Sequence, residues 1–392
     1  MAERTLGDPL DADRIAFFEA LAEGFRRAAR AADTIEKDYR VAGARLRLRF
    51  AGGALVPILD PALSHLAAEP SGGHSALADC TIELFDSAST ATPLPLLVRS
   101  LVDLLRLRWW EHLDNRREIS RYHGGPLRAA FHLGPDILSV LDVERRRALY
   151  WVNDASDLPY YERGYPITNL LNWWLSERGL VVVHAAVIGN ASGAVLLPGK
   201  GGSGKSTTTL ASTAAGLAIV GDDYCAVDPV TGVAHSLYNT VKLKADADVE
   251  RFSGLEAFMR HMERVGEGDD RQRSMVHLHP HFAGAMTAAL PVRAILVPRV
   301  TGEPGTTISP ASAGAALKAL APSTMFQLAG NERGAFGAMA DLVRRIPPFE
   351  IALGTRIDAI PAAIGRFLDS GAWADGRRPS GGTRPAAPAH AS

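Results

Sequence analysis

One nonapeptide, residues 199–207, constrains the fold of this chain more than any other segment. It reads Gly-Lys-Gly-Gly-Ser-Gly-Lys-Ser-Thr and fits the pattern G-x-x-x-x-G-K-[ST]. An apolar run at 194–197 precedes it and a helix-forming segment follows it, which is the context that gives this pattern meaning. Closely spaced glycines let successive backbone N–H groups converge on phosphate oxygens at the positive end of the following helix. The sequence therefore predicts a strand, a phosphate-binding loop and a helix.

The residue types in this loop predict which ligand it takes. Lys205 would reach the β- and γ-phosphates of a nucleoside triphosphate, and the hydroxyl of Ser206 would be a ligand of Mg²⁺. We therefore expect ATP and Mg²⁺ as the bound species. The predicted nucleotide-binding residues are Gly199, Gly201, Gly202, Ser203, Gly204, Lys205, Ser206 and Thr207.

Two consecutive aspartates, Asp222 and Asp223, follow the next predicted strand at 217–220. In a β-α-β unit the two strands run parallel, so their carboxyl ends, and with them both aspartates, lie at the edge that holds the phosphates. One carboxylate there can hold Mg²⁺, while the other can accept the proton of an attacking hydroxyl. We place Asp222 with Ser206 in the predicted metal site and both aspartates among the predicted catalytic residues. The pattern leaves open which of them is the base.

Two other positions near the loop have a structural and a functional interpretation. His184 lies in an apolar strand predicted at 180–188, where a histidine is either a satisfied core residue or part of a site. Lys242 and Lys244 are two apart on a strand-like stretch, so their side chains would share one face. That face could clamp a transferring phosphate or attract an acidic substrate, or it could simply be solvated.

Apolar periodicity predicts the remaining organisation. We expect an α+β domain at 1–165, a catalytic α/β domain at 166–370 and a disordered tail at 371–392. Residues 158–166, rich in aromatics, proline and glycine, mark a linker or domain edge. In the first domain we expect an amphipathic helix at 11–32, strands at 45–50 and 80–85, a buried helix at 97–107, and a strand pair at 137–141 and 148–152. The tryptophan pairs 109–110 and 173–174 are interpreted as core or interface anchors.

Composition excludes several classes of protein. The 42 Lys and Arg residues balance 43 Asp and Glu residues, without the basic excess typical of nucleic-acid binding. No secretion signal is recognised, and no apolar run approaches the ~20 residues that a membrane span needs. The only two cysteines, Cys80 and Cys225, suit a reducing compartment. We expect a cytoplasmic protein that contacts neither membrane nor nucleic acid.

The order of these motifs resembles that of HPr kinase/phosphorylase and of the wider group of bacterial HPr-kinase-like serine kinases. The resemblance covers about residues 164–368 and is most specific from His184, through the loop, to Asp222 and Asp223. It implies an α/β P-loop kinase domain of the HPr kinase C-terminal type, similar to the nucleotide-binding fold of phosphoenolpyruvate carboxykinase, preceded by a mixed α+β domain that could recognise substrate. It also implies that His184 lies near the reacting phosphate. The Leu-Glu-Ile-Arg-Gly stretch of true HPr kinases is missing after the Asp pair, so HPr itself is not expected as the substrate.

The resemblance implies a Mg-ATP-dependent phosphotransferase with Asp223, Asp222, His184 and Lys205 as its catalytic residues. The acceptor would be a serine-type hydroxyl of a protein or peptide, for example a ribosomally made precursor peptide, and the chain could form a homo-oligomer. Two alternatives remain open: a P-loop nucleotide hydrolase and a non-catalytic ATP-binding sensor.

Overall fold

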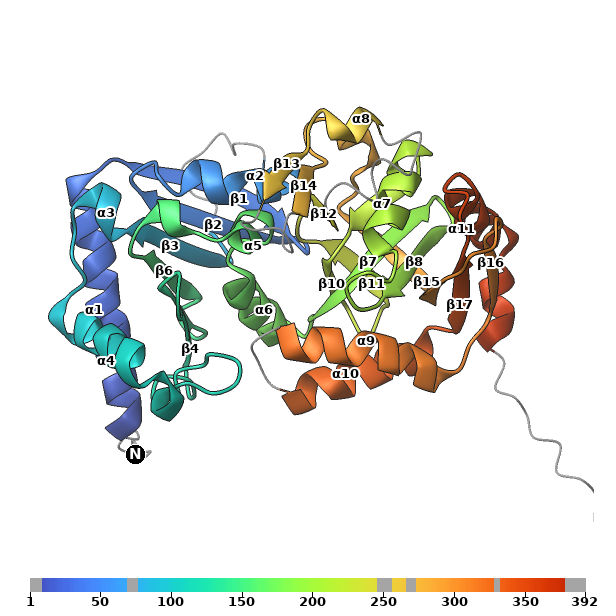
Figure 1. The fold of residues 1–392 in the computed structure, drawn as a ribbon. Coiled ribbons are helices and arrows are strands. Elements are labelled where there is room, and N and C mark those ends of the chain that lie inside the picture. The colour runs from blue at the N-terminus through green and yellow to red at the C-terminus, as the bar shows by residue number, and fades with distance from the viewer. Residues whose placement is uncertain (1–8, 69–76, 245–255, 266–272, 328–331, 378–392) are drawn as a thin grey trace, which may run out of the picture.

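The computed structural model describes residues 9–68, 77–244, 256–265, 273–327 and 332–377, and within these ranges it is a mixed α/β protein (Figure 1). Its strands form three sheets in the described part of the chain, two of them large and one small. One large sheet lies in the N-terminal half and the other in the C-terminal half.

The N-terminal sheet has six strands in the order β1-β2-β3-β6-β5-β4. Helices α1 (Pro9–Ala31) and α4 (Leu96–His112) cover one face, where Phe17, Phe18 and Leu21 pack on Phe85 and Trp151. On β2 the side chains alternate, so that leucines at 46 and 48 enter the core on the opposite face while arginines at 45, 47 and 49 do not. The strand bounds are β1 (Thr34–Val41), β2 (Ala44–Ala51), β3 (Cys80–Asp86), β4 (Leu127–His132), β5 (Ile137–Asp142) and β6 (Arg147–Val152).

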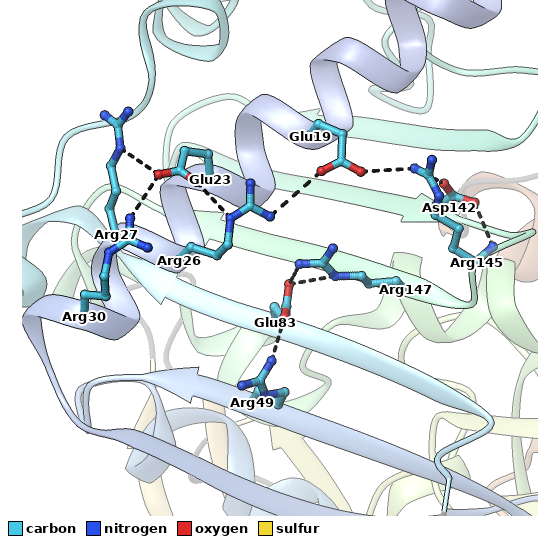
Figure 2. A network of polar contacts seen from close by, with 10 residues as sticks. All are labelled: Glu19, Glu23, Arg26, Arg27, Arg30, Arg49, Glu83, Asp142, Arg145 and Arg147. Carbon is cyan, nitrogen blue, oxygen red and sulfur yellow. Dashed lines mark hydrogen bonds and ion pairs between the residues drawn. The ribbon is translucent and has the colours of Figure 1, made fainter.

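Ion pairs link neighbouring strands of this sheet to one another and to helix α1 (Figure 2). Glu83 of β3 is only 3% exposed, and it accepts hydrogen bonds from Arg49 of β2 at 2.9 Å and from Arg147 of β6 at 2.6 Å. Arg145 reaches both Asp142 and Glu19 of α1, which attaches the helix to the β5–β6 turn. A buried carboxylate with two guanidinium partners is well compensated, so Glu83 holds three strands in register.

The C-terminal sheet has eight strands, five of which close into a ring in the order β7-β8-β15-β11-β10. Strand β7 pairs antiparallel with β8 on one side and with β9 and β10 on the other, so β8 and β9 are parallel to each other. This arrangement confirms that their carboxyl ends share one edge. The bounds are β7 (Val181–Asn190), β8 (Gly193–Pro198), β9 (Ala218–Gly221), β10 (Tyr224–Val227), β11 (Val233–Ser236), β15 (Ala289–Val300), β16 (Thr307–Pro310) and β17 (Pro348–Leu353).

Helices cover both faces of this second sheet. Leu210 of α7 (Lys205–Ala214) and Ile364 of α11 (Ala359–Ser370) pack on one face, together with the small sheet. Leu320 of α9 (Ala313–Gln327) and Leu342 of α10 (Glu332–Arg345) pack on the other, and Figure 1 shows this helix pair along the lower side of the sheet. The small antiparallel sheet has the order β12 (Thr240–Lys244), β14 (Arg273–His277) and β13 (Glu263–Val265). Short elements complete the described chain: α3 (Ser87–Thr90), α5 (Tyr160–Gly164), α8 (Glu256–Met259), η1 (Ser64–Leu66), η2 (Ala155–Asp157), η3 (Ala283–Ala285) and η4 (Ala372–Arg377).

The two large sheets share one apolar core at the centre of the molecule. This cluster joins β2 and α2 (Val56–Leu63) to α6 (Thr168–Glu177), and continues to Val182 of β7 and Tyr238. Polar contacts cross the same junction, since Asn239 Nδ2 donates to Pro61 O at 2.9 Å and His65 Nε2 lies 2.7 Å from Ser236 Oγ. The domain boundary expected near 165 stays a prediction, but the chain on both sides of it contributes to this core.

Most of the expected helices and strands are confirmed within two to four residues, and two expectations are wrong. Helix α4 is not buried as a whole, because only Val98, Val102 and Leu105 are buried while Leu107 is exposed. The pair at 109–110 is no core anchor either, since Trp110 is 61% exposed; the pair at 173–174 is buried as expected. Of the predicted tail, 372–377 form η4, and 378–392 lie outside the described residues.

Two further observations concern the expected location of the protein. Both cysteines are free and buried. Among the described helices, none is long and apolar enough to cross a membrane.

Candidate functional site

The loop between β8 and α7 has a positive φ at three glycines, Gly199, Gly202 and Gly204, and a Cβ atom on Gly199 would lie 2.6 Å from Ser203 Oγ. Gly202 and Gly204 have φ of +84° and +95°, a region that side-chain-bearing residues rarely adopt. A Cβ atom on Gly204 would also lie 2.6 Å from Leu353 Cδ1 of β17. At Gly201 a Cβ atom would meet nothing within 4 Å, so the glycine there is not required for packing. The loop is therefore folded closely over the end of β17.

Lys205 lies across this loop as the first residue of α7. Its side chain is buried with 5% exposure, and Nζ donates to Gly199 O at 2.6 Å. Nearby, the buried hydroxyl of Ser203 has no hydrogen-bond partner in the described chain. An ammonium group, an unpaired hydroxyl and the N–H groups of the first helical turn thus face the same region, which is a favourable setting for phosphate oxygens.

A cleft of about 460 Å³ opens above the loop. Residues 201–207 form its floor, and one wall is apolar, with Leu353, Ile357 and Ile360. The other wall is polar and carries Asp223, His184 and Lys242 among others. A cleft of this size with one apolar and one polar side matches the usual form of sites for small organic ligands.

Asp222 stands at the end of β9 with 2% exposure and bonds to the helix that follows the loop. Ser206 Oγ donates to its Oδ2 at 2.7 Å, and Thr209 Oγ1 donates to its Oδ1 at 2.6 Å. Burial, and then the neighbouring charge of Asp223, raise the pKa of Asp222, while the two hydroxyls and Lys205 oppose that rise. Asp222 and Ser206, the two predicted metal ligands, are therefore in direct contact.

Asp223 points away from Asp222 into the cleft, as expected for consecutive residues. Tyr165 donates its phenol to Asp223 Oδ2 at 2.6 Å, and His184 Nε2 lies 3.3 Å from Oδ1. Burial works to raise the pKa of Asp223, but the bond and charge of His184, with Lys242 and Lys205, outweigh it and hold the pKa below its usual range. Asp223 is consequently a carboxylate kept ionised in a buried place.

His184 lines the cleft beside Asp223. The register of β7 places it opposite Tyr224, whose ring centroid is 5.2 Å from the imidazole. One ring nitrogen faces Asp223, while Nδ1 is buried and has no hydrogen-bond partner among the described residues. The purely structural interpretation required a histidine whose two ring nitrogens are both hydrogen-bonded within the core. His184 does not meet this requirement.

Lys242 reaches the cleft from the small sheet. Its ammonium lies 4.0 Å from the ring centroid of Tyr165, a cation–π contact. Burial lowers the pKa of Lys242 to about 8, although the charge of Asp223 opposes this. Lys242 is therefore a cleft residue and not part of a solvated face; the side chain of Lys244 lies outside the described residues.

Sequence reasoning missed three polar residues of the site. Tyr165 stood inside a segment interpreted as a linker, Thr209 looked like an ordinary helix residue, and Arg273 of β14 lines the cleft from an element that the sequence did not connect with the loop. Only Thr209 had a detectable signal, since it lies one helical turn after Lys205 and so on the same face of α7. His277 ends β14, and no group of three metal-ligating side chains occurs in the described ranges.

Known protein families offer no direct evidence on this site. No family model matches the chain, and no curated protein shows significant sequence similarity to it.

Proposed function

We propose that this protein is an ATP-dependent kinase that transfers the γ-phosphate to a serine-type hydroxyl, with the P-loop architecture of the HPr-kinase-like enzymes. The observation that supports the proposal is that the two aspartates of the pair have different partners. Asp222 bonds to Ser206 of the loop, while Asp223 faces the open cleft beside His184 and Tyr165. One carboxylate is thus directed at the phosphate-binding loop and the other at the space left for an acceptor.

The loop and its surroundings suit a nucleoside triphosphate. Backbone N–H groups at the start of α7 and the Lys205 ammonium would bind the β- and γ-phosphates. The apolar wall with Leu353 and Ile357 would hold the base. Lys205 Nζ now donates to Gly199 O and would exchange this bond for bonds to phosphate oxygens.

The residues present also fit Mg²⁺. A hydroxyl and a carboxylate in contact, Ser206 with Asp222, are hard oxygen ligands, and Mg²⁺ in such sites takes its remaining ligands from phosphates and water. When bound, the ion neutralises charge that develops on the transferring group. Thr209 would hold the second oxygen of Asp222 and so fix the carboxylate.

Asp223 would orient the acceptor. Each carboxylate oxygen has two lone pairs, so Asp223 can accept a hydrogen bond from an acceptor hydroxyl while it keeps those to Tyr165 and His184. The hydroxyl oxygen attacks the γ-phosphorus, the bond to the bridging oxygen breaks, and ADP leaves with its electron pair. Its lowered pKa keeps Asp223 ionised and able to accept this hydrogen bond but also makes it a weak base, so the hydroxyl proton would pass to Asp223 only late, as the new bond to phosphorus forms.

Phosphoryl transfer from γ-labelled ATP to the peptides encoded beside this gene tests the proposal. We expect Lys205→Ala to abolish transfer and to weaken nucleotide binding, whereas Lys200→Ala, an exposed lysine of the same loop, should retain both. Asp223→Asn should leave nucleotide binding largely intact and lower transfer by roughly 10² to 10⁴, the usual contribution of a general base. The control is Asp228→Asn, in the turn that follows β10, which should retain both nucleotide binding and transfer.

Unchanged turnover in both Lys205→Ala and Asp223→Asn would contradict the proposal. Release of phosphate with no labelled acceptor, at the same rate with and without peptide, would instead indicate a nucleotide hydrolase.

A further inference from the structure

A second, smaller cavity lies behind Tyr165, on the side of the N-terminal sheet. It measures about 110 Å³, and Tyr165 and Tyr224 belong to both this cavity and the larger cleft. Its remaining walls come from β4, β5, β6, α5 (Tyr160–Gly164) and the start of α6. Tyr165 thus connects the cavity with Asp223, because its ring lines the cavity and its hydroxyl donates to that carboxylate.

The cavity contains one buried acid. Glu162 is 7% exposed, and its Oε2 accepts hydrogen bonds from Tyr150 Oη at 3.1 Å and from Ile167 N at 3.3 Å. The hydrogen bonds that the described residues make to the Glu162 carboxylate both end on Oε2, and no lysine, arginine or histidine of that part of the chain lies within ion-pair distance of it, although the charge of Arg117 is near enough to lower the pKa of Glu162. A carboxylate oxygen is thus available to a ligand in an enclosed place, where an unpaired charge is costly.

The other walls favour a cation. Four tyrosines line the cavity, at 150, 161, 165 and 224, and the faces of aromatic rings attract ammonium groups. His132 is the only basic lining residue, and burial, with the nearby Arg117, lowers its pKa to about 4, so it is neutral near pH 7. The Tyr165 ring already holds the ammonium of Lys242 in the neighbouring cleft. Among the described residues that line the cavity, Glu162 is therefore the one that can carry a formal charge near pH 7, and the charge of Arg117, which is not a lining residue, acts on it from nearby.

We propose that this cavity binds a primary ammonium group of the phosphate acceptor, with Glu162 as its anionic partner and the tyrosines as its walls. The volume fits the amino end of a small molecule or of one residue and not a folded surface. A ligand anchored there would extend past Tyr165 toward Asp223, so the acceptor would carry an amine close to the hydroxyl that receives the phosphate. The assignment of this amine to the phosphate acceptor rests on the proposed kinase function, whereas the amine site itself does not.

Binding measured without nucleotide tests the amine site independently. Ethylammonium chloride is titrated into the full chain and followed by calorimetry and by the ultraviolet difference spectrum of tyrosine, with ethanol and acetamide as uncharged probes of similar size. We expect saturable binding of ethylammonium only. In Glu162→Gln the affinity should fall about tenfold to a hundredfold, the usual effect of losing a charged hydrogen-bond partner. Glu144→Gln, an exposed acid, should bind as the wild type does.

Several outcomes would overturn the proposal. They are absence of saturable ethylammonium binding to the folded wild-type protein, equal binding of the uncharged probes, and unchanged affinity in Glu162→Gln. The wild-type comparison of charged and uncharged probes remains decisive if the variant does not fold.

Two further arms identify the source of the amine. Ethanolamine is compared with a serine-glycine-glycine peptide bearing a free or an acetylated N-terminus, first for binding and then as acceptors with labelled ATP. Tighter binding of ethanolamine assigns a free amino alcohol, and tighter binding of the free-amino peptide assigns a chain terminus. Amine binding without any phosphoryl transfer would retain the site and refute the kinase. Transfer to both forms of the peptide at equal rates, with ethanolamine not phosphorylated, would retain the kinase and refute the role of the amine site in binding the acceptor.

Discussion

Replacing Glu162 by glutamine should change how the stability of the protein depends on pH. Burial raises the pKa of Glu162 from 4.5 to about 7, against the opposing hydrogen bonds of Tyr150 and Ile167 and the opposing charge of Arg117. Between these two values the folded state holds a proton that the unfolded state has lost, so the wild type loses stability as pH rises. Glutamine does not titrate but can still accept both hydrogen bonds. The free energy of unfolding of the wild type, relative to the variant, should fall by about 2.5 kcal/mol from pH 5 to pH 8.

Urea denaturation at pH 5, 6, 7 and 8, followed by tryptophan fluorescence, measures this difference. All other titrating groups are common to the two proteins and cancel in the comparison. Glu144→Gln should give a curve parallel to that of the wild type. If the curves of wild type and Glu162→Gln are also parallel within about 0.5 kcal/mol, or diverge in the opposite direction, Glu162 is not the buried, unpaired acid that the amine site requires.

Three other substitutions test the main site. Gly204→Ala places a side chain at positive φ and against the leucine that ends β17, so it should cost about 1–3 kcal/mol in urea denaturation, whereas Gly201→Ala, with open space around it, should be nearly neutral. Thr209→Val removes a hydroxyl from a buried carboxylate and should cost about 1.5–3 kcal/mol by the same measurement; Thr213→Val, which loses only a bond to a backbone carbonyl, should cost less. Tyr165→Phe keeps the ring and removes the hydrogen bond to the second aspartate, so kcat should fall about tenfold while nucleotide affinity, measured by calorimetry, stays unchanged. Equal effects of each variant and its control, or loss of nucleotide binding in Tyr165→Phe, would contradict these assignments.

The sequence predicted the parts of the site that lie close together along the chain. The loop, its lysine and the Asp pair lie between residues 199 and 223, on a strand, a helix and a second strand that follow one another directly, so local chemistry determines their geometry. Lys242 and Tyr165 could not be placed in this way, because they reach the cleft from the small sheet and from the junction between the halves. Their position depends on packing between distant segments, which periodicity does not report.

Two residues show that periodicity alone does not determine the surroundings of a side chain. His184 was ambiguous on its strand, and only the pairing of β7 with β10 and the bond to Asp223 decided in favour of the site. Trp110 looked like a core residue because it is large and apolar, yet α4 turns it outward. Periodicity identifies a helix with an apolar face, but it does not tell which of its turns finds a partner.

The core that joins β2 and α2 to α6, β7 and Tyr238 affects how the protein can be divided. A fragment starting at Pro166 would keep the loop and both aspartates but would expose the buried side of α6 and Tyr238 to water. It would also lose Tyr165, and with it the phenol that holds Asp223. We therefore expect the two halves to unfold in a single thermal transition. A destabilising substitution in the N-terminal sheet, far from the cleft, would then reduce the amount of folded, active protein without changing the site itself.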